Sequence, residues 1–169
     1  FYAESGGQIG DKGKFASKSS TGSILDCKKQ GKVYIHKALV EKGKIKTGDV
    51  IKMSVEKEKR SAIAIHQSST HLVHAALRQV LGDHVQQKGS LVDENKLRFD
   101  FSHDKPLTQN EITQIETIVN KQGLNNSEVK TELMNIDDAL KSGAMALFGE
   151  KYDDEVRVLS MGDDSYSVE

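Results

Sequence analysis

Residues 61–82 read SAIAIHQSSTHLVHAALRQVLG, and their apolar side chains recur with the period of a helix. At 100° per residue these side chains gather on one face, which contains Ala62, Ile65, Leu72, Val73, Ala76, Leu77 and Val80. Gly82 follows the last periodic residue, a position where helices commonly end. The sequence therefore predicts an amphipathic helix over residues 61–81.

A narrow polar stripe runs along the other side of this predicted helix. It contains Gln67, His71, His74 and Arg78, with Thr70 at its edge. Side chains three or four residues apart project side by side on a helix, so His71 and His74 can share a metal or catalytic site. A polar stripe of this kind is more often solvent-facing, and the spacing alone leaves both interpretations open. His66 falls on the apolar side and is expected to be partly buried or to lie in a pre-helical turn.

Upstream of the helix, short strand-like runs are separated by glycines. β-branched residues alternate with Lys and Ser in four runs, at 13–17, 23–27, 31–38 and 48–55. Regular short strands with glycine turns are typical of a small β-barrel or sandwich. The charged run at 56–60 predicts a hinge or an exposed edge between this part and the helix.

Downstream of the helix, the pattern predicts a hairpin, a second helix and further strands. The hairpin arms are 84–92 and 96–102. Thr108 and Glu111 form a capping box for a helix that ends at Gly123. Two strands at 129–134 and 156–161 are expected, with a short helical stretch near 137–147 between them.

Helices packed on an antiparallel sheet make this downstream part an α+β unit. We therefore predict an α+β protein with two domains, a small β-barrel over residues 1–58 and an α+β core over residues 59–169.

The charge of the chain is divided between these two parts. Residues 1–60 hold 14 Lys and Arg against 7 Asp and Glu, whereas residues 61–169 hold 10 against 18. Such asymmetry indicates a polyanionic partner for the basic part, although a solvated Lys-rich surface is the commoner explanation. The single cysteine excludes an internal disulfide, and no apolar window is long enough for a membrane span. We expect a soluble protein of the reducing cytoplasm.

Two short polar segments are candidate binding elements. Gln87 and Lys88 offer an amide and a cation beside the flexible Gly89, which suits a ribose–phosphate end, while an ordinary polar strand explains them equally. Near the N-terminus, Gly6 and Gly7 precede Gln8, and a tight turn accounts for them without any function.

Taken together, five segments resemble the editing domain of bacterial alanyl-tRNA synthetases. They are FYAESGGQ (1–8), STHLVHAALR (69–78), QKGSL (87–91), LRFDFSH (97–103) and GAMALFGEKY (143–152), and they occur in the family's order. The AlaX editing proteins and the editing domain of threonyl-tRNA synthetases are more distant relatives. The resemblance implies a β-barrel followed by an α+β editing core, taken from inside a longer cytoplasmic synthetase.

The function that this resemblance implies is hydrolysis of the ester in Ser-tRNA(Ala) and Gly-tRNA(Ala). The implied partners are the acceptor end of tRNA(Ala) and the other domains of the same synthetase, with no membrane and no DNA. ATP and magnesium belong to the synthetase domain outside this chain. In the wider family, zinc is held by a His-x-x-x-His pair on the helix and a later Cys-x-x-x-His.

Carried over position by position, Thr70 matches the threonine that screens serine, Gln87 matches the pocket glutamine, and His71 matches the second helix histidine. The Gly6-Gly7-Gln8 loop matches one placed near the acceptor end. We add Arg78 and Lys88 as candidate phosphate contacts. His74 is a candidate catalytic group by its position, although a polar contact that stabilises the helix is the commoner role for such a residue, and the sequence does not identify the general base.

Two departures from the family bear on the metal. The first helix ligand falls on Gln67, and the family's Cys-Gly-Gly-Thr-His segment would begin about where the chain ends. Zinc sites use three or four nitrogen or sulfur ligands, so we expect this chain to be zinc-free and weak or inactive as a hydrolase. An alternative is a non-catalytic module that binds the tRNA acceptor stem, which the basic residues 1–60 favour. A His-based metallohydrolase unrelated to tRNA is disfavoured by the resemblance of several segments.

Overall fold

The computed structural model describes residues 1–142, 144, 154–162 and 166–168. Most of the resembling segment 143–152 and the end of the short helix expected near 137–147 lie outside the described residues. The chain divides into two compact units, one of residues 1–67 and 90–98 and the other of residues 68–89 and 99–169. The predicted domain limits, 1–58 and 59–169, stay predictions.

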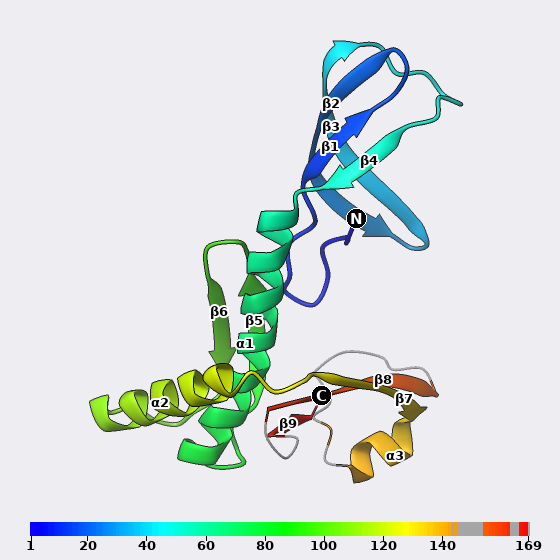
Figure 1. Ribbon diagram of the computed structural model, residues 1–169. Coiled ribbons are helices and arrows are strands. Elements are labelled where there is room, and N and C mark those ends of the chain that lie inside the picture. Colours follow the sequence, from blue (N-terminus) through cyan, green and yellow to red (C-terminus); the bar gives the residue numbers. More distant parts are fainter. Residues whose placement is uncertain (143, 145–153, 163–165, 169) are drawn as a thin grey trace. The chain divides into compact units, whose positions relative to one another are not determined.

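Four strands form the sheet of the first unit (Figure 1). They are β1 (Gly13–Ala16), β2 (Ser20–Gln30), β3 (Val33–Gly43) and β4 (Lys52–Val55). The strands pair antiparallel in the order β3–β2–β1–β4, and Gly13 of β1 lies opposite both Ile24 and Val55. The four expected strands are confirmed, while closure of the sheet into a barrel stays a prediction.

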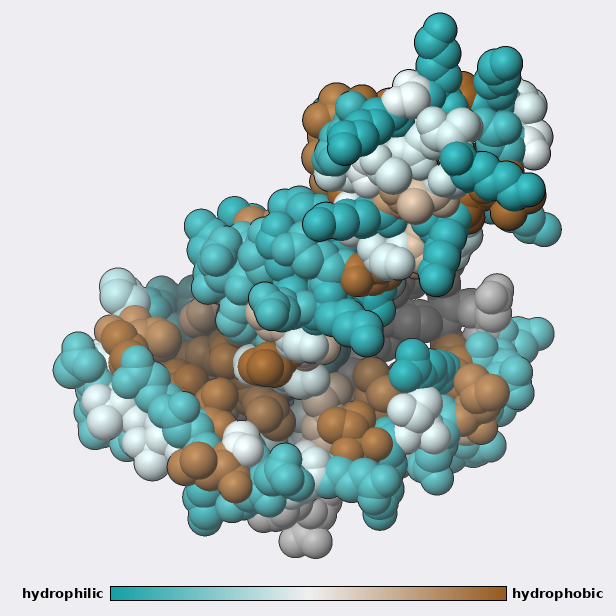
Figure 2. Space-filling model, turned by 45° about the horizontal axis from the view of Figure 1, so that its top comes forward, coloured by the Kyte–Doolittle hydropathy of each residue, from teal (hydrophilic) through white to brown (hydrophobic). Residues whose placement is uncertain are grey.

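Alternation along β1 and β2 supplies the core of the first unit. Phe15, Ile24 and Cys27 are the buried hydrophobic residues of these strands, and each buried residue is flanked by exposed or half-buried ones. β3 is exposed along nearly all of its length and carries Val33, Tyr34, Ile35, Leu39 and Val40 among its exposed side chains. Figure 2 shows hydrophobic patches among hydrophilic side chains on the visible face.

The helix α1 spans Lys57–Leu81, so it begins four residues earlier than expected. The charged run 56–60 is therefore not a hinge, because residues 57–60 form the first turn of the helix, and residues 56–58 are exposed as the alternative prediction had it. Lys, Glu and Arg are good helix formers, and Arg60 is held by Asp11 far along the chain. Gly82 follows the helix with a φ of +114°, as the C-terminal signal predicted.

A hairpin follows α1, with β5 (Gln87–Val92) paired to β6 (Leu97–Phe101). Its turn is organised by Asp93, whose Oδ1 accepts hydrogen bonds from the backbone N–H of Asn95 at 2.7 Å and of Lys96 at 2.9 Å. This side-chain capture of the backbone is the Asx mechanism expected at such a turn.

Helix α2 (Gln109–Asn125) begins with the predicted capping box. The Thr108 Oγ1 accepts a hydrogen bond from the Glu111 N–H at 3.3 Å, and the Glu111 carboxylate accepts one from the Thr108 N–H at 2.7 Å. Those hydrogen bonds hold the pKa of Glu111 below its usual value. The helix passes the predicted end at Gly123 and stops at Asn126, which adopts the left-handed conformation.

The remaining described elements form a small antiparallel sheet with one helix. They are β7 (Lys130–Asn135), α3 (Ile136–Lys141), β8 (Glu155–Met161) and β9 (Ser167–Val168), with β8 between the other two strands. The two-residue β9 was not predicted. With antiparallel sheets and helices, the structure confirms the mixed, α+β character of the chain. No described helix has the length and apolar character that crossing a membrane requires.

The core of the second unit lies where α1, α2 and the hairpin segments meet. Ala76, Leu77, Val85 and Ile115 are buried together, and Phe99 is among the side chains packed against them. Val73 and Val80 also pack here, which confirms much of the predicted apolar face of α1. Ile65 is an exception, because 64% of it is exposed.

Candidate functional site

Two polar residues of the α1 stripe are buried. Thr70 is 4% exposed and His74 is 6% exposed. The His74 ring lies against the Phe99 ring of β6, with 5.3 Å between centroids and 42° between planes. A buried polar side chain is informative, since burial costs free energy that an apolar side chain avoids. The solvent-facing interpretation is therefore wrong for these two residues.

The next two stripe residues, Gln67 and His71, are half-buried and lie one turn apart on α1. The backbone carbonyl of His71 accepts a hydrogen bond from the Ser167 Oγ at 3.4 Å, so β9 lies beside this turn of the helix. His66 is half-buried as expected, and its Nδ1 lies 2.7 Å from the carbonyl oxygen of Asp93.

Arg78 stabilises the end of α1. Its Nη2 donates to the Asp83 Oδ1 at 3.0 Å, and its Nη1 donates to the Val85 carbonyl at 3.4 Å. A basic side chain in the last turn also suits the negative end of the helix dipole. These contacts account for Arg78 locally, and its phosphate contact stays a prediction.

Gln87 and Lys88 open β5. Gln87 is half-buried and Lys88 is exposed, with the Lys88 Nζ donating to the Gln86 Oε1 at 3.3 Å. A Cβ on the adjacent Gly89 would come within 3.0 Å of the Asp100 Oδ2, so the backbone passes close to β6 here.

The Gly6-Gly7-Gln8 loop packs on the far end of β5, within the first unit. The Val92 N–H donates to the Gly7 carbonyl at 2.8 Å, and the Ser90 Oγ donates to the Gly6 carbonyl at 3.4 Å. Gly7 has a φ of +81°, and a Cβ there would lie 2.6 Å from the Ser90 carbonyl oxygen. Only glycine fits at this position, so the double glycine serves loop packing as well as the turn.

An ion pair that sequence reasoning missed lies in the first unit. Asp11 is 2% exposed, and its carboxylate accepts hydrogen bonds from the Arg60 guanidinium, one of them from Nε at 2.8 Å. Burial opposes ionisation of Asp11, but the hydrogen bonds from Arg60 and from the Tyr2 N–H outweigh it and lower the pKa. No local pattern signals this pair, because 49 residues separate its members.

Comparison with known proteins bears on the whole chain. Residues 1–59 match the family model described as tRNA synthetases class II (A). The chain is 55% identical over 163 residues to an alanine–tRNA ligase of Rhodopseudomonas palustris, and 55% identical over 164 residues to one of Nitrosomonas eutropha; both comparisons cover 96% of the chain. The chain belongs to the alanyl-tRNA synthetase family. A third relative, the alanine–tRNA ligase of Parvibaculum lavamentivorans, is 51% identical over 177 residues and covers all of the chain.

Each alanine–tRNA ligase is much longer than the matched chain. The matched part makes up 18%, 19% and 20% of the three relatives, so the chain spans about a fifth of their length. The resemblance of the chain to alanyl-tRNA synthetases is thus confirmed.

The zinc site expected of the family does not fit the residues present on α1. Gln67 supplies an amide where the family has an imidazole, and Zn²⁺ favours thiolate, imidazole and carboxylate ligands. Among the described residues, His71 belongs to no group of three His, Cys, Asp or Glu side chains close enough to share an ion. One imidazole is too few for a stable zinc site.

Proposed function

We propose that this chain is the editing part of an alanyl-tRNA synthetase, which hydrolyses Ser-tRNA(Ala) and Gly-tRNA(Ala). The observation that carries the proposal is the burial of Thr70 and His74 on α1, in a chain that matches alanine–tRNA ligases along 96% of its length. A hydroxyl and an imidazole held inside a packed unit are suited to recognising a small polar ligand.

The chemistry of alanine selection explains why a second, hydrolytic site is needed. Serine adds one hydroxyl to alanine and glycine lacks one methyl. A single binding pocket separates such amino acids by only about 1–3 kcal/mol, so errors are removed by cleaving the mischarged product.

In the proposed reaction, a water oxygen attacks the carbonyl carbon of the aminoacyl ester. The bond between that carbon and the ribose oxygen then breaks, and the ribose oxygen takes up a proton. The products are free serine or glycine and uncharged tRNA.

We assign three side chains of the second unit to this reaction. The Thr70 hydroxyl screens the substrate side chain, and the Gln87 amide hydrogen-bonds the ester as charge develops on its oxygen. His74 is the candidate proton acceptor for the attacking water, since its imidazole is held in place by Phe99.

The acceptor end of tRNA(Ala) is the proposed partner of the other candidate polar residues. The Gly6-Gly7-Gln8 loop is assigned to the terminal adenosine, and Lys88 and Arg78 to phosphates. The excess of Lys and Arg in residues 1–60 supports this partner, because phosphates dominate the affinity of proteins for nucleic acids.

Deacylation of purified Ser-tRNA(Ala), Gly-tRNA(Ala) and Ala-tRNA(Ala) tests the proposal. It is run on this chain and on a form extended beyond Glu169. We expect the extended form to hydrolyse the first two substrates and spare the third, and this chain to be weak or inactive. Equal hydrolysis of all three by the extended form contradicts editing.

The alternative is a module that binds the acceptor stem without catalysing a reaction. Two observations favour it: residues 1–60 are rich in Lys, and only one of the two metal-ligand positions on α1, His71, is an imidazole. It predicts salt-sensitive binding of tRNA(Ala) by both forms and turnover by neither.

A further inference from the structure

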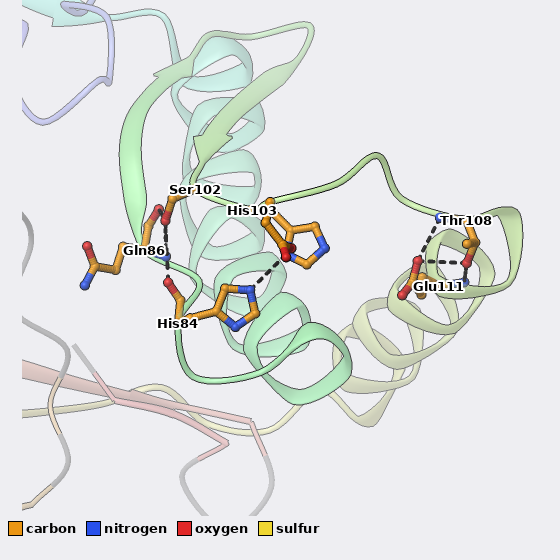
Figure 3. Close-up of polar contacts among 7 residues, drawn as sticks. His84, Gln86, Ser102, His103, Thr108 and Glu111 are labelled. Atoms are coloured by element: carbon orange, nitrogen blue, oxygen red, sulfur yellow. Dashed lines mark hydrogen bonds and ion pairs between the residues drawn. The ribbon is translucent and has the colours of Figure 1, made fainter.

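Two histidines from distant parts of the second unit lie against each other. His84 comes between α1 and β5, and His103 follows β6. Their rings stack with 5.1 Å between centroids and 25° between planes, and the His84 Nε2 lies 2.9 Å from the His103 Nδ1 (Figure 3). The Asp104 Oδ1 lies 3.6 Å from the same His103 Nδ1.

The hairpin backbone holds both histidines in register. The Gln86 N–H donates to the Ser102 Oγ at 3.2 Å, and the Ser102 N–H donates to the Gln86 carbonyl at 3.0 Å (Figure 3). The His103 side chain is 7% exposed, whereas Asp104 is 82% exposed and His84 is exposed. One ligand is therefore fixed in place, and two are reachable from solvent.

We propose that His84, His103 and Asp104 form a binding site for a divalent transition-metal ion of the Zn²⁺ class. Two imidazoles and one carboxylate suit Zn²⁺ and its neighbours better than Mg²⁺ or Ca²⁺, which take oxygen ligands. Three protein ligands leave a fourth position for water, as in open zinc sites.

The distances already approach those of such a site. Zinc–ligand bonds of about 2.1 Å at tetrahedral angles place neighbouring ligand atoms about 3.4 Å apart. The two distances here, 2.9 Å and 3.6 Å, lie on either side of this value, and all three ligand atoms lie within 4.8 Å of one another. Small side-chain rotations therefore suffice.

Coordination requires a free lone pair on each of the two facing nitrogens. In the neutral pair, one hydrogen lies between the His84 Nε2 and the His103 Nδ1. On metal binding this hydrogen moves to the other nitrogen of its own ring, so no proton need leave the pair. The site is separate from Gln67 and His71 on α1. It therefore departs from the expectation that the whole chain is zinc-free, while the lack of a fitting zinc site on α1 itself is unaffected.

Titration of the whole chain with Zn²⁺ tests the proposal, with calorimetry for affinity and Co²⁺ absorption for the ligand set. We expect one ion per chain, a raised Tm with Zn²⁺, and an affinity at least about tenfold weaker in H84N and D104N. Both substitutions fall on exposed side chains, so the variants should fold. H103N changes the ligand with the least exposed side chain and should weaken Zn²⁺ binding in the same way.

Asp83→Asn is the matched control, because Asp83 neighbours His84 but pairs with Arg78 and lies outside the site. It should bind Zn²⁺ as the unaltered chain does, and so should H71Q. Zn²⁺ binding that survives in H84N and D104N, or that is lost in H71Q, overturns the proposal. If the unaltered chain does not bind Zn²⁺, the proposal is also overturned, and the hydrogen bond between His84 and His103 has only a structural role.

Discussion

The first unit buries a carboxylate that is paired with a partly exposed guanidinium, whereas the second buries a hydroxyl and an imidazole on a helix. Asp11 is enclosed, and its carboxylate is bonded to the Arg60 guanidinium and the Tyr2 N–H. Thr70 and His74 are buried to nearly the same degree, on the helix that also supplies Leu77 to the core. Polar side chains are thus buried to a similar degree in both units, but they have different roles.

The two sets of buried polar residues differ in whether they contribute to the stability of the fold. The Asp11–Arg60 pair joins the N-terminal segment to the first turn of α1, so its effect is on folding. Thr70 and His74 lie on α1 among its apolar core positions, and the His74 ring packs on Phe99. We therefore expect the Asp11–Arg60 pair to control stability, and Thr70 and His74 to control chemistry.

Arg60→Ala should give the largest loss of stability. It leaves the Asp11 carboxylate buried without its cation, and breaking a buried pair in this way costs about 3–5 kcal/mol. Because Arg60 is 43% exposed, the lower end of that range is expected. Urea denaturation near neutral pH measures the change.

Lys59→Ala is the control, since Lys59 forms an exposed pair with Glu56 at 3.2 Å in the same turn of α1. Exposed pairs contribute at most about 1 kcal/mol. If Arg60→Ala and Lys59→Ala lower the free energy of unfolding by similar amounts, the Asp11–Arg60 pair does not stabilise the first unit as we infer.

Gly7→Ala should have an intermediate effect, with Gly6→Ala as its matched control. Both glycines have positive φ, and an alanine at either position carries a left-handed penalty of about 1–2 kcal/mol. Only at Gly7 would the added Cβ strike the Ser90 backbone, whereas nothing lies within 4 Å of one at Gly6. The Gly7 variant should melt at the lower temperature; equal melting of both would contradict the packing of this loop on β5.

Lowering the pH should remove the contribution of the ionised Asp11 carboxylate to the free energy of unfolding. We expect this effect to be smaller than those of the substitutions above. The pKa of Asp11 is lowered in the folded chain from its usual 3.8, so its stabilisation is complete above that value and is lost as pH falls through the folded pKa. Below about pH 4 the unfolding free energy of the unaltered chain should therefore fall more steeply than that of Arg60→Ala. If the free energy of unfolding falls equally steeply with pH in the unaltered chain and in Arg60→Ala, Asp11 does not stabilise the fold through its ionised form.

Local signals in the sequence predicted local structure well. The capping box of Thr108 and Glu111 and the stop at Gly82 are confirmed because their partners lie within a few residues. The four strands of the first unit are confirmed because side-chain alternation and glycine turns are local signals, although β2 and β3 are longer than expected.

Contacts between distant residues could not be predicted. The start of α1 was placed too late because its first turn is charged and is held by Asp11, which is 49 residues away. Periodicity placed Thr70 and His74 on a polar stripe but could not show that β6 covers His74. His84 and His103 are 19 residues apart, and no known ligand spacing marks them.

The most direct test of the account is the ratio of Ala-tRNA(Ala) to Ser-tRNA(Ala) hydrolysis by the form extended beyond Glu169, with and without Thr70→Val. Removing the hydroxyl but keeping the shape should raise this ratio about tenfold or more with little change in Tm. Thr113→Val, on an exposed position of α2, should leave the ratio unchanged. An unchanged ratio in a folded Thr70→Val protein would contradict the claim that the buried polar groups of α1 form the editing site.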